Sequence, residues 1–438
     1  MAKIIGIRRE DKNEWERRVP LTPQAVRTLK DKFGIKTIVQ PSDLRIFKNE
    51  EYIKAGGEIN ESLSEADTIF AVKEIPISFL EEGKTYIFFS HTIKGQSYNM
   101  DLLRAMMEKK INLIDYERIV DEKNRRLIFF GKYAGLAGMV ETLYGMGQKL
   151  KLQGFDTPLA KIKQAYSYSS VEEAKDHIRG IGEEIEESGF PPELSPFVFA
   201  FAGYGNVSRG AQEIFDLLPY KSMSIDVIEL NYENFSADNC IFYKVILKEE
   251  DLVKRKTGQF DLIEYYNNPE LYVPKFEEYA ENIKVLVNCI YWTEKYPRLL
   301  TKEYLKNQAT LLKYPNLRMI GDISCDIDGS IEITHKVTMP DNPSFTYFGD
   351  GDRFEDGINA EGVSVMAVDN LPCEFPKESS EAFSEVLLDF VSGISGTDYS
   401  SEFGSLTMPA PAKRALILHR GELTGDYEYM KSFVLEEE

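Results

Sequence analysis

A glycine-rich segment, Gly203-Tyr-Gly-Asn-Val-Ser-Arg-Gly210, has the residue types and spacing that dinucleotide binding requires. It follows an apolar run, 197–202, that predicts a buried strand, and it precedes apolar residues spaced as on one helix face. The first glycine permits a tight turn, the second lets the backbone approach a pyrophosphate, and free N–H groups of the helix hold the anion. We therefore expect a dinucleotide site made by the turn residues Gly203, Gly205, Asn206, Val207, Ser208 and Arg209. The alternative is a glycine turn that binds no ligand.

The choice between the two nicotinamide dinucleotides depends on the next strand of such a domain. An acidic residue at its end would bind the ribose diol of NAD(H). That strand is poorly defined in the sequence KSMSID, and Asp226 or Glu229 could supply the acid. Arg209, Lys221 and Ser222 could instead hold the 2′-phosphate of NADP(H). These residues leave both cofactors open.

Two proton-transfer candidates follow neighbouring predicted strands in the first part of the chain. Lys73 ends the strand 68–72, and His91 follows the strand 85–89. Ligands of open α/β sheets bind beyond the carboxyl ends of the strands, so both residues are expected at a site. A histidine exchanges protons near neutral pH, and a lysine does so when burial and nearby cations make it less basic. The alternatives are a solvated lysine and a structural histidine.

Arginines gather near the same predicted strand ends. Arg18 lies shortly before the helix that we predict over 22–31, and Arg125 and Arg126 lie together before another apolar run. Guanidinium groups bind carboxylates in bidentate fashion, so this grouping favours a carboxylate-rich substrate. Taken singly, each arginine could equally be a solvated side chain.

The predicted elements around these residues alternate between strands and helices, which is typical of parallel βαβ units. Strands are expected at 3–7, 36–40, 68–72, 85–89, 112–114, 197–202, 284–287 and 318–320, and helices at 22–31, 133–152, 170–188 and 380–391. The helix over 133–152 carries four glycines, which predicts close packing against another helix. Residues 338–363, rich in glycine, aspartate and proline, are expected to form a long solvated loop.

Length and composition limit the remaining possibilities. The 438 residues suffice for two to three domains, and the net charge of −20 argues against binding to nucleic acid or to an anionic membrane. There is no apolar run of about 18 residues that could span a bilayer. The four cysteines form no CxxC pair and do not cluster with the four histidines, so neither a metal site nor a disulfide framework is expected. The first residues do not read as a signal or transit peptide, and we expect a cytoplasmic protein.

These motifs together resemble a known family. REDKNEWERRVPLTP (9–23), AVKEIP (71–76), FFSHTIKGQ (88–96), GKYAGLAGM (131–139), FAGYGNVSRGAQEIF (201–215) and DISCDIDGSIE (322–332) are similar to the lysine–2-oxoglutarate reductase half of the α-aminoadipic semialdehyde synthases. More distantly, the chain resembles lysine-forming saccharopine dehydrogenase, alanine dehydrogenase and the transhydrogenase α subunit. The resemblance runs almost from end to end, and only 153–195 and 220–250 look divergent.

The resemblance implies an α/β fold with two Rossmann-like domains, a cleft between them and long linking helices. One domain is then made from both chain ends. The implied division is a first part of the catalytic domain over 1–135, a linking helix and connector over 136–195, a dinucleotide-binding domain over 196–365, and a second linking helix with the return to the catalytic domain over 366–438.

The resemblance also implies a reaction. In that family the ε-amine of lysine condenses with 2-oxoglutarate, and NADPH reduces the imine to saccharopine without a metal. Lys73 and His91 match the acid/base pair. The matches that contact substrate or adjust its charge are Glu16, Arg18, Glu117, Arg125 and Arg126, and those near the nicotinamide end are Ile290, Tyr291 and Asp322.

We therefore expect an oxidoreductase of lysine degradation that uses NADP(H), with NAD(H) as the alternative cofactor. Lysine, 2-oxoglutarate and saccharopine are its expected small-molecule partners, and a homo-oligomer is compatible with the sequence. Two alternatives stay open at this point: an amino-acid dehydrogenase of the alanine type, and a nucleotide-binding module without catalytic activity.

Overall fold

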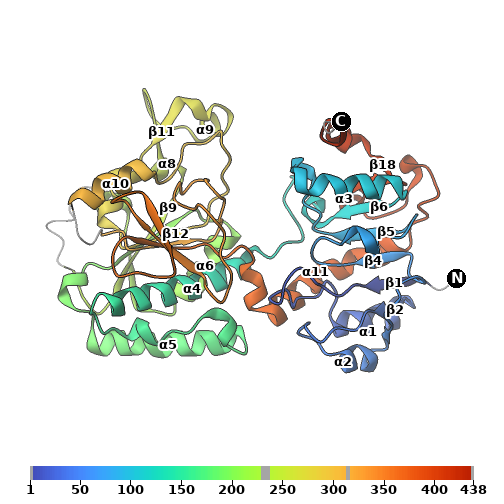
Figure 1. Ribbon diagram of the computed structural model, residues 1–438, viewed down its shortest axis with the longest axis horizontal. Helices are drawn as coiled ribbons and strands as arrows, with labels where there is room; N and C mark the ends of the chain where they lie inside the picture. Colours follow the sequence, from blue (N-terminus) through green and yellow to red (C-terminus); the bar gives the residue numbers. More distant parts are fainter. Residues whose placement is uncertain (1–2, 228–236, 312–315, 436–438) are drawn as a thin grey trace. The chain divides into compact units, whose positions relative to one another are not determined.

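The computed structural model describes residues 3–227, 237–311 and 316–435, and its chain divides into two compact units (Figure 1). Unit 1 comprises residues 1–130 and 376–438, and unit 2 comprises residues 131–375. Unit 1 is thus assembled from both ends of the chain, and unit 2 is inserted into it.

The centre of unit 1 is a mainly parallel sheet of eight described strands in the order β18-β17-β6-β5-β4-β1-β2-β3. The strands from the first part of the chain, β1 to β6, run parallel, while β17 and β18 form an antiparallel extension next to β6. The strands are β1 (Ile4–Ile7), β2 (Lys36–Val39), β3 (Glu58–Ile59), β4 (Thr68–Phe70), β5 (Thr85–Phe88), β6 (Asn112–Asp115), β17 (Leu416–His419) and β18 (Glu422–Leu423).

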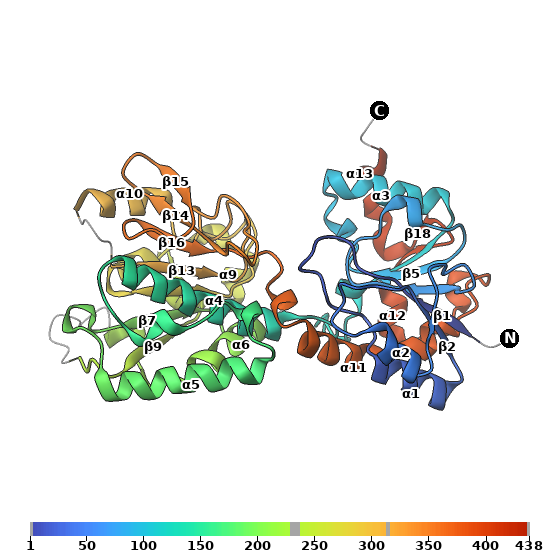
Figure 2. The same cartoon turned by 60° about the horizontal axis from the view of Figure 1, so that its bottom comes forward.

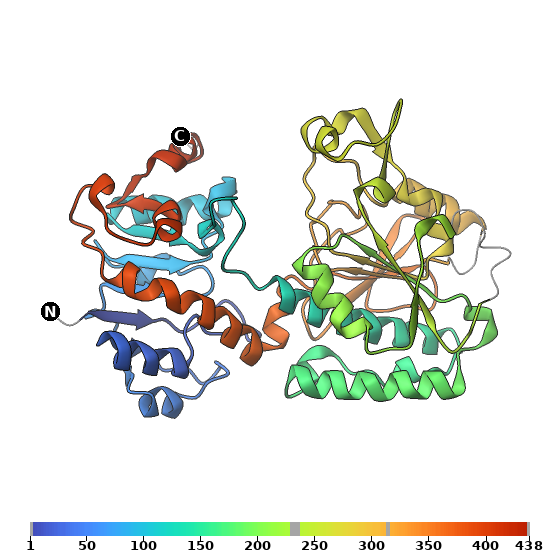
Figure 3. The same ribbon diagram turned by 180° about the vertical axis from the view of Figure 1, so that it is seen from behind.

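Helices cover this sheet and bring together segments that are far apart in the sequence. The longer ones are α1 (Pro23–Phe33), α3 (Ser97–Glu108) and α11 (Pro376–Ser395), and the shorter ones are α2 (Asn49–Lys54), α12 (Ala410–Arg414) and α13 (Lys431–Leu435). Serines of α11 bond the segment before α1: the Ser380 and Ser384 hydroxyls each accept a backbone N–H, from Val19 and Thr22, at 3.0 Å. Figure 3 shows α11 lying along the strands of the first 130 residues.

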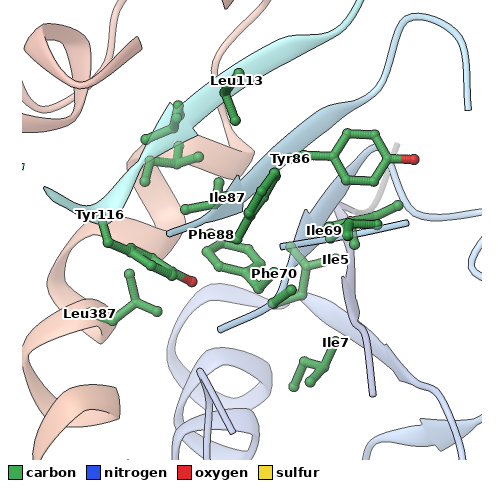
Figure 4. Close-up of a cluster of buried hydrophobic side chains, with 14 of the residues drawn as sticks. Ile5, Ile7, Ile69, Phe70, Tyr86, Ile87, Phe88, Leu113, Tyr116 and Leu387 are labelled. Carbon is green, nitrogen blue, oxygen red and sulfur yellow. The ribbon is translucent and has the colours of Figure 1, made fainter. Parts of the chain in front are cut away.

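The core of unit 1 consists of the apolar faces of these strands and helices. Figure 4 shows Phe70 and Phe88 from neighbouring strands. Beside them lie Tyr116, which follows β6, and Leu387, which belongs to α11. All four side chains are fully buried. Because α11 contributes to this core, the last part of the chain is an integral part of unit 1.

Unit 2 has a second sheet of eight described strands in the order β15-β14-β16-β13-β12-β7-β9-β8. Six neighbouring strands of this sheet, from β16 across to β8, run parallel to one another. The remaining two, β14 and β15, are antiparallel additions next to β16. They are β7 (Val198–Ala202), β8 (Tyr220–Ser222), β9 (Phe242–Leu247), β12 (Val285–Asn288), β13 (Met319–Asp322), β14 (Ser344–Phe348), β15 (Arg353–Asp356) and β16 (Val363–Met366), beside a ribbon of β10 (Val253–Arg255) and β11 (Tyr272–Pro274).

Two hydrophobic clusters cover the two faces of this sheet because successive side chains of a strand alternate. Phe199 and Phe201 of β7 join the cluster with α4, α5 and α6, whereas Val198 and Ala200 join the cluster on the other face. Figure 2 shows α4, α5 and α6 on the same side of the unit. The α-helices in the described part of unit 2 are α4 (Gly131–Leu152), α5 (Val171–Ser188), α6 (Asn206–Phe215), α8 (Glu249–Leu252), α9 (Leu262–Asn267) and α10 (Lys302–Leu311).

Four glycines of α4, Gly135, Gly138, Gly145 and Gly147, lie where neighbouring atoms come close, as their number predicted, and at Gly135 and Gly147 these atoms are backbone. A Cβ at Gly135 would collide with the carbonyl oxygen of Val207, and one at Gly210 would collide with that of Lys132. The helices α4 and α6 therefore pack backbone against backbone. The helix that contains the dinucleotide motif is fixed to the longest helix of unit 2.

The expectation of an α/β fold with two mainly parallel sheets is confirmed, but one predicted segment is wrong. Residues 338–363 do not form a solvated loop throughout, because β14 within them is fully buried between β15 and β16. Four of its five residues, SFTYF, are aromatic or β-branched, the types that are enriched in strands. The glycine, aspartate and proline residues around them dominated the composition and concealed the strand.

Candidate functional site

The proton-transfer candidates lie at the carboxyl edge of the unit 1 sheet. Lys73 follows β4, His91 follows β5 and Glu117 follows β6, and these three strands are adjacent and parallel. The three residues therefore lie along one edge of the sheet, as expected for residues that follow neighbouring parallel strands.

Glu16 and Arg18 form a bidentate ion pair inside unit 1. Arg18 donates from Nε at 2.8 Å and from a terminal nitrogen at 2.5 Å to the two carboxylate oxygens of Glu16. Both residues are at most 2% exposed, and the guanidinium lies 4.2 Å from the centre of the Phe130 ring. The pair holds the arginine in a fixed position, which sequence spacing alone did not indicate.

Glu10 holds the backbone that carries Lys73. Its carboxyl oxygens accept the N–H groups of Val72 at 2.7 Å and of Lys73 at 2.9 Å. Burial and the charge of Glu16 raise the pKa of Glu10 to about 7, although these two N–H groups act in the opposite direction. A buried acidic group with a pKa near neutrality thus lies directly behind the backbone of Lys73.

His91 is held by Glu74 from the same loop as Lys73. Its Nδ1 atom lies 2.5 Å from a carboxylate oxygen of Glu74, and Lys12 lies 3.6 Å from the other oxygen. Burial acts to raise the pKa of Glu74, but the hydrogen bond and charge of His91, with the charge of Lys12, outweigh it and lower the pKa to about 2. Glu74 is therefore a carboxylate at neutral pH and orients the imidazole through one ring nitrogen.

The backbone of His91 is unusual, with φ at +52°. This left-handed conformation is uncommon for a residue with a side chain, and it persists only where neighbouring contacts hold it. The side-chain amide of the buried Asn99 donates to the carbonyl oxygen of His91 at 3.2 Å. The conformation directs the imidazole toward Glu74 at the start of a short 3-10 turn, Thr92–Lys94.

Asp115 joins the loops of His91 and Glu117. One of its carboxylate oxygens accepts the Ser90 N–H at 2.9 Å and the Ser90 hydroxyl, and the other accepts the Glu117 N–H at 2.8 Å. Asp115 is completely buried, and burial raises its pKa. The carboxyl group of Asp115 therefore ties the two loops together.

The expected substrate arginines differ in their environment. Arg126 pairs with Glu117 at 3.0 Å, and Arg125 pairs with Asp121 at 2.7 Å. The Arg125 side chain is 73% exposed and that of Arg126 51%. Arg126 is thus tied to the loop at the end of β6, whereas Arg125 forms a local surface pair.

The glycine turn of unit 2 has the expected backbone. Gly203 has φ at +93°, a conformation that suits glycine, and Gly205 caps the start of α6. A Cβ at Gly205 would meet no atom within 4 Å, so space is open beside the first N–H groups of the helix. Ser208, in place of a third glycine, is buried and accepts a hydrogen bond from Gln212 at 2.9 Å. The turn therefore fits the pyrophosphate of a dinucleotide.

Of the residues expected to choose the cofactor, Lys221 and Ser222 lie on the edge strand β8, Asp226 follows it, and Arg209 lies in α6. Arg209, Lys221, Ser222 and Asp226 are all exposed, and β8 is short. Glu229 lies outside the described residues. The arrangement contains both an acid and cations, as the sequence indicated.

Of the residues expected near the nicotinamide end, Ile290 and Tyr291 follow β12, and Asp322 is the last residue of β13. The Ile290 side chain lies against Gly203, since a Cβ there would be 3.1 Å from it. Tyr291 is 80% exposed. Asp322 is buried, and burial raises its pKa against hydrogen bonds from Thr334 at 2.6 Å and Asn288 at 2.9 Å. Asp322 therefore organises the neighbouring strand ends through its own hydrogen bonds.

Sequence reasoning missed three acidic residues of unit 1: Glu10, Glu74 and Asp115. Glu74 stands next to Lys73, and its position beside a candidate base was a usable signal. Asp115 is the last residue of β6, a polar residue at a strand end. For Glu10 the sequence offers no comparable signal, because its bonds go to backbone groups 62 and 63 positions away.

Within the described ranges there is no group of three or more histidine, cysteine, aspartate or glutamate side chains that could hold a metal ion. Among the helices in the described part of the chain, none has the length and apolar character needed to cross a membrane.

Comparisons with known proteins agree with the resemblance seen in the motifs. Residues 6–137 match the family model described as alanine dehydrogenase/PNT, N-terminal domain. The chain is 39% identical to an alpha-aminoadipic semialdehyde synthase from Arabidopsis thaliana, over 98% of this chain and 41% of that protein. It is 35% identical to the mitochondrial alpha-aminoadipic semialdehyde synthase of Mus musculus, over 98% of this chain and 47% of the relative. The chain thus spans about half the length of these curated relatives or less.

Two more distant likenesses extend over nearly the whole chain. A saccharopine dehydrogenase [NAD(+), L-lysine-forming] from Emericella nidulans is 25% identical, over 88% of this chain and 90% of that protein. A solved L-alanine dehydrogenase has a TM-score of 0.62 at 14% identity, covering 98% of both chains, and supports the fold. The resemblance expected from the sequence is confirmed.

Proposed function

We propose that the chain is a reductase that condenses the ε-amine of L-lysine with 2-oxoglutarate and reduces the product to saccharopine with NADPH. The observation that carries this proposal is the pairing of His91 with Glu74 in unit 1, with Lys73 in the same loop. The names of the relatives that match 98% of the chain support the same activity and a role in lysine degradation.

In this proposal His91 and Lys73 divide the proton transfers. Forming and dehydrating the carbinolamine requires a group that gives and takes a proton at oxygen, which suits His91. Because Glu74 engages Nδ1, the proton would pass through Nε2. Lys73 would serve the nitrogen that becomes a secondary amine, while Arg18 and Arg126 bind substrate carboxylates.

The nicotinamide cofactor would supply the hydride for the reduction. The turn at Gly203 and Gly205, with the N–H groups at the start of α6, would hold its pyrophosphate. We propose NADP(H) as the preferred form, with Arg209, Lys221 and Ser222 as candidates for the 2′-phosphate. Asp226 and the name of the fungal relative favour NAD(H) as the alternative.

The deciding experiment follows NADPH oxidation with two substrate pairs. Turnover is expected with lysine plus 2-oxoglutarate, and saccharopine should be identified in the product by mass spectrometry. Turnover only with pyruvate plus ammonia would overturn the proposal in favour of an alanine-type dehydrogenase, a candidate that the family match over 6–137 supports. Turnover with neither pair, together with intact cofactor binding, would favour a binding module.

The cofactor site has a matched pair of variants. Gly205→Ala should weaken NADPH binding by about tenfold, because the methyl group enters open space beside the N–H groups that would hold the pyrophosphate. Gly180→Ala in α5, where a Cβ also meets nothing within 4 Å, is the control. Fluorescence titration with NADPH and NADH measures both the loss and the preference. Equal binding by the two variants would argue against this turn as the cofactor site.

The compartment and the assembly stay predictions. We expect a cytoplasmic protein, although the mouse relative is described as mitochondrial. Small molecules are the proposed partners, and a homo-oligomer remains part of the proposal.

A further inference from the structure

The segment 425–434, which we call the strap, contacts the loop that carries His91. It consists of a 3-10 helix, Gly425–Met430, and residues 431–434 of the following α13. The Tyr429 hydroxyl donates to the carbonyl oxygen of Ile93 at 3.0 Å. The ring of Phe433 lies so close to Gly95 that a Cβ there would come within 2.6 Å of it.

The strap is anchored in the core of unit 1. Tyr427 and Met430 are at most 1% exposed and belong to the main hydrophobic cluster. The Tyr427 hydroxyl donates to the carbonyl oxygen of Arg414 at 2.7 Å. These anchors fix the strap independently of the loop that Tyr429 and Phe433 contact.

The strap also reaches the loop after β6. Arg118 donates from Nε to the Tyr427 hydroxyl at 3.1 Å, and its guanidinium lies 5.7 Å from the centre of that ring. Arg118 is the neighbour of Glu117. One buried tyrosine thus connects the strap to the second of the two loops that Asp115 joins.

The conformation of the His91 loop requires such support. The loop 91–95 has left-handed backbone at both ends, with φ at +52° for His91 and +65° for Gly95. At its first end the Asn99 amide and Glu74 hold His91. At its other end, Tyr429 of the strap bonds the carbonyl oxygen of Ile93, and Phe433 of the strap lies against Gly95.

We propose that Tyr429 and Phe433 are positioning residues for His91. They act through the loop 91–95 and hold the imidazole where Glu74 orients it. The kinetic consequence rests on the function proposed above, whereas the structural consequence does not.

The test uses Tyr429→Phe and Phe433→Ala in the full chain. Reaction of His91 with diethyl pyrocarbonate, measured on its peptide by mass spectrometry, should become about two- to tenfold faster in each, the range that loss of one net contact corresponds to. Hydrogen exchange of residues 91–96 should accelerate to a similar degree. His335 in unit 2 is the internal reference and should react as in the wild type.

Two control variants lie outside the strap. Tyr98→Phe removes an exposed hydroxyl that donates to Gln96, and Phe33→Ala removes a half-exposed ring at the end of α1. Neither should alter the reactivity of His91. Because Tyr429→Phe removes only a hydroxyl, it remains decisive if Phe433→Ala does not fold.

The kinetic readout separates positioning from general stability. With lysine and 2-oxoglutarate, kcat should fall by up to about a hundredfold in Phe433→Ala, the cost of displacing a catalytic group by 1 Å, with NADPH affinity unchanged. Wild-type reactivity of His91 and wild-type exchange of 91–96 in both folded variants would overturn the proposal. If the wild-type chain turns over neither substrate pair, the proposed function fails, and the labelling experiment still decides the role of the strap.

Discussion

The ion-paired carboxylates at the candidate site of unit 1 differ from a pair of carboxyl groups in the core of unit 2. In unit 1, Glu16, Glu74 and Glu117 at the candidate site each pair with a cationic or imidazole side chain. In unit 2, Glu141 of α4 and Glu374 are both buried, and they lie close enough for each to affect the ionisation of the other. No salt bridge to either is recorded within the described residues.

The difference appears in the direction of the pKa shifts. The pKa of Glu74 is lowered to about 2 despite burial, because His91 and Lys12 stabilise its charge. Burial raises the pKa of Glu141 to about 7, and burial with the charge of Glu141 raises that of Glu374 well above its usual value. An ion-pairing partner thus keeps Glu74 charged, whereas burial without such a pair favours the protonated form, in Glu141 and Glu374 of unit 2 as in Glu10 of unit 1.

The largest effect is expected when the proposed proton-exchanging groups of the candidate site are removed. His91→Gln and Lys73→Met should each lower kcat by about 10²–10⁴-fold, with little change in NADPH affinity. The double variant should lose less than the product of the two effects, because both groups act on one reaction path. Steady-state kinetics at saturating substrate checks this. A raised KM with kcat intact would mean that these residues only bind substrate.

The second test breaks the ion pair of Glu16. Arg18→Met should destabilise unit 1 by ~3–5 kcal/mol, since it leaves a buried carboxylate without its guanidinium partner. The double variant Glu16→Gln/Arg18→Met should recover part of this loss. The chain has two tryptophans, Trp15 and Trp292, one in each unit, so urea unfolding in a Trp292→Phe background reports unit 1. Arg17→Met is the matched control, and an equal loss in it would contradict the role of the ion pair.

The third test concerns the carboxyl pair of unit 2. Because the pKa of Glu141 is raised in the folded state, the folded chain binds more protons between about pH 4.5 and 7, and stability falls as the pH rises through this window. In Glu141→Gln, the free energy of unfolding should fall by ~1–3 kcal/mol less between pH 5 and pH 8 than in the wild type. Trp292 fluorescence in a Trp15→Phe background measures it. Glu187→Gln on the exposed face of α5 should follow the wild-type curve, and a wild-type curve for Glu141→Gln would contradict the assignment.

The smallest effect is expected at the surface arginines. Arg125→Gln should change stability by less than about 0.5 kcal/mol, because its partner Asp121 lies at the surface. Arg126→Gln should raise the KM of a substrate more than Arg125→Gln does, since Arg126 is tied to Glu117 of the candidate site. Equal KM values in the two variants would remove Arg126 from the proposed set of substrate contacts.

The sequence predicted those features that depend on local patterns. The strand before Gly203, the helix after it and the close approach of the α4 glycines all follow from apolar spacing and residue size. The ends of β4 and β5 placed Lys73 and His91 on one edge for the same reason. These are short-range signals.

The features that the sequence did not reveal depend on contacts between distant residues. Glu10 bonds backbone groups 62 and 63 positions away, and Tyr429 bonds a carbonyl 336 positions away. The buried strand β14 was obscured by polar neighbours on both sides. In each case the decisive partner comes from another part of the fold, where residue spacing carries no information.

The insertion of unit 2 has a consequence for synthesis on the ribosome. Strand β17, which pairs with β6, is made only after the whole of residues 131–375. At about 5–20 residues per second, the sheet of unit 1 waits on the order of 10–60 s for this strand. During that time β6 is an open edge, a template for pairing with another chain. The nascent chain is therefore exposed to misassembly at this edge while its second unit is being made.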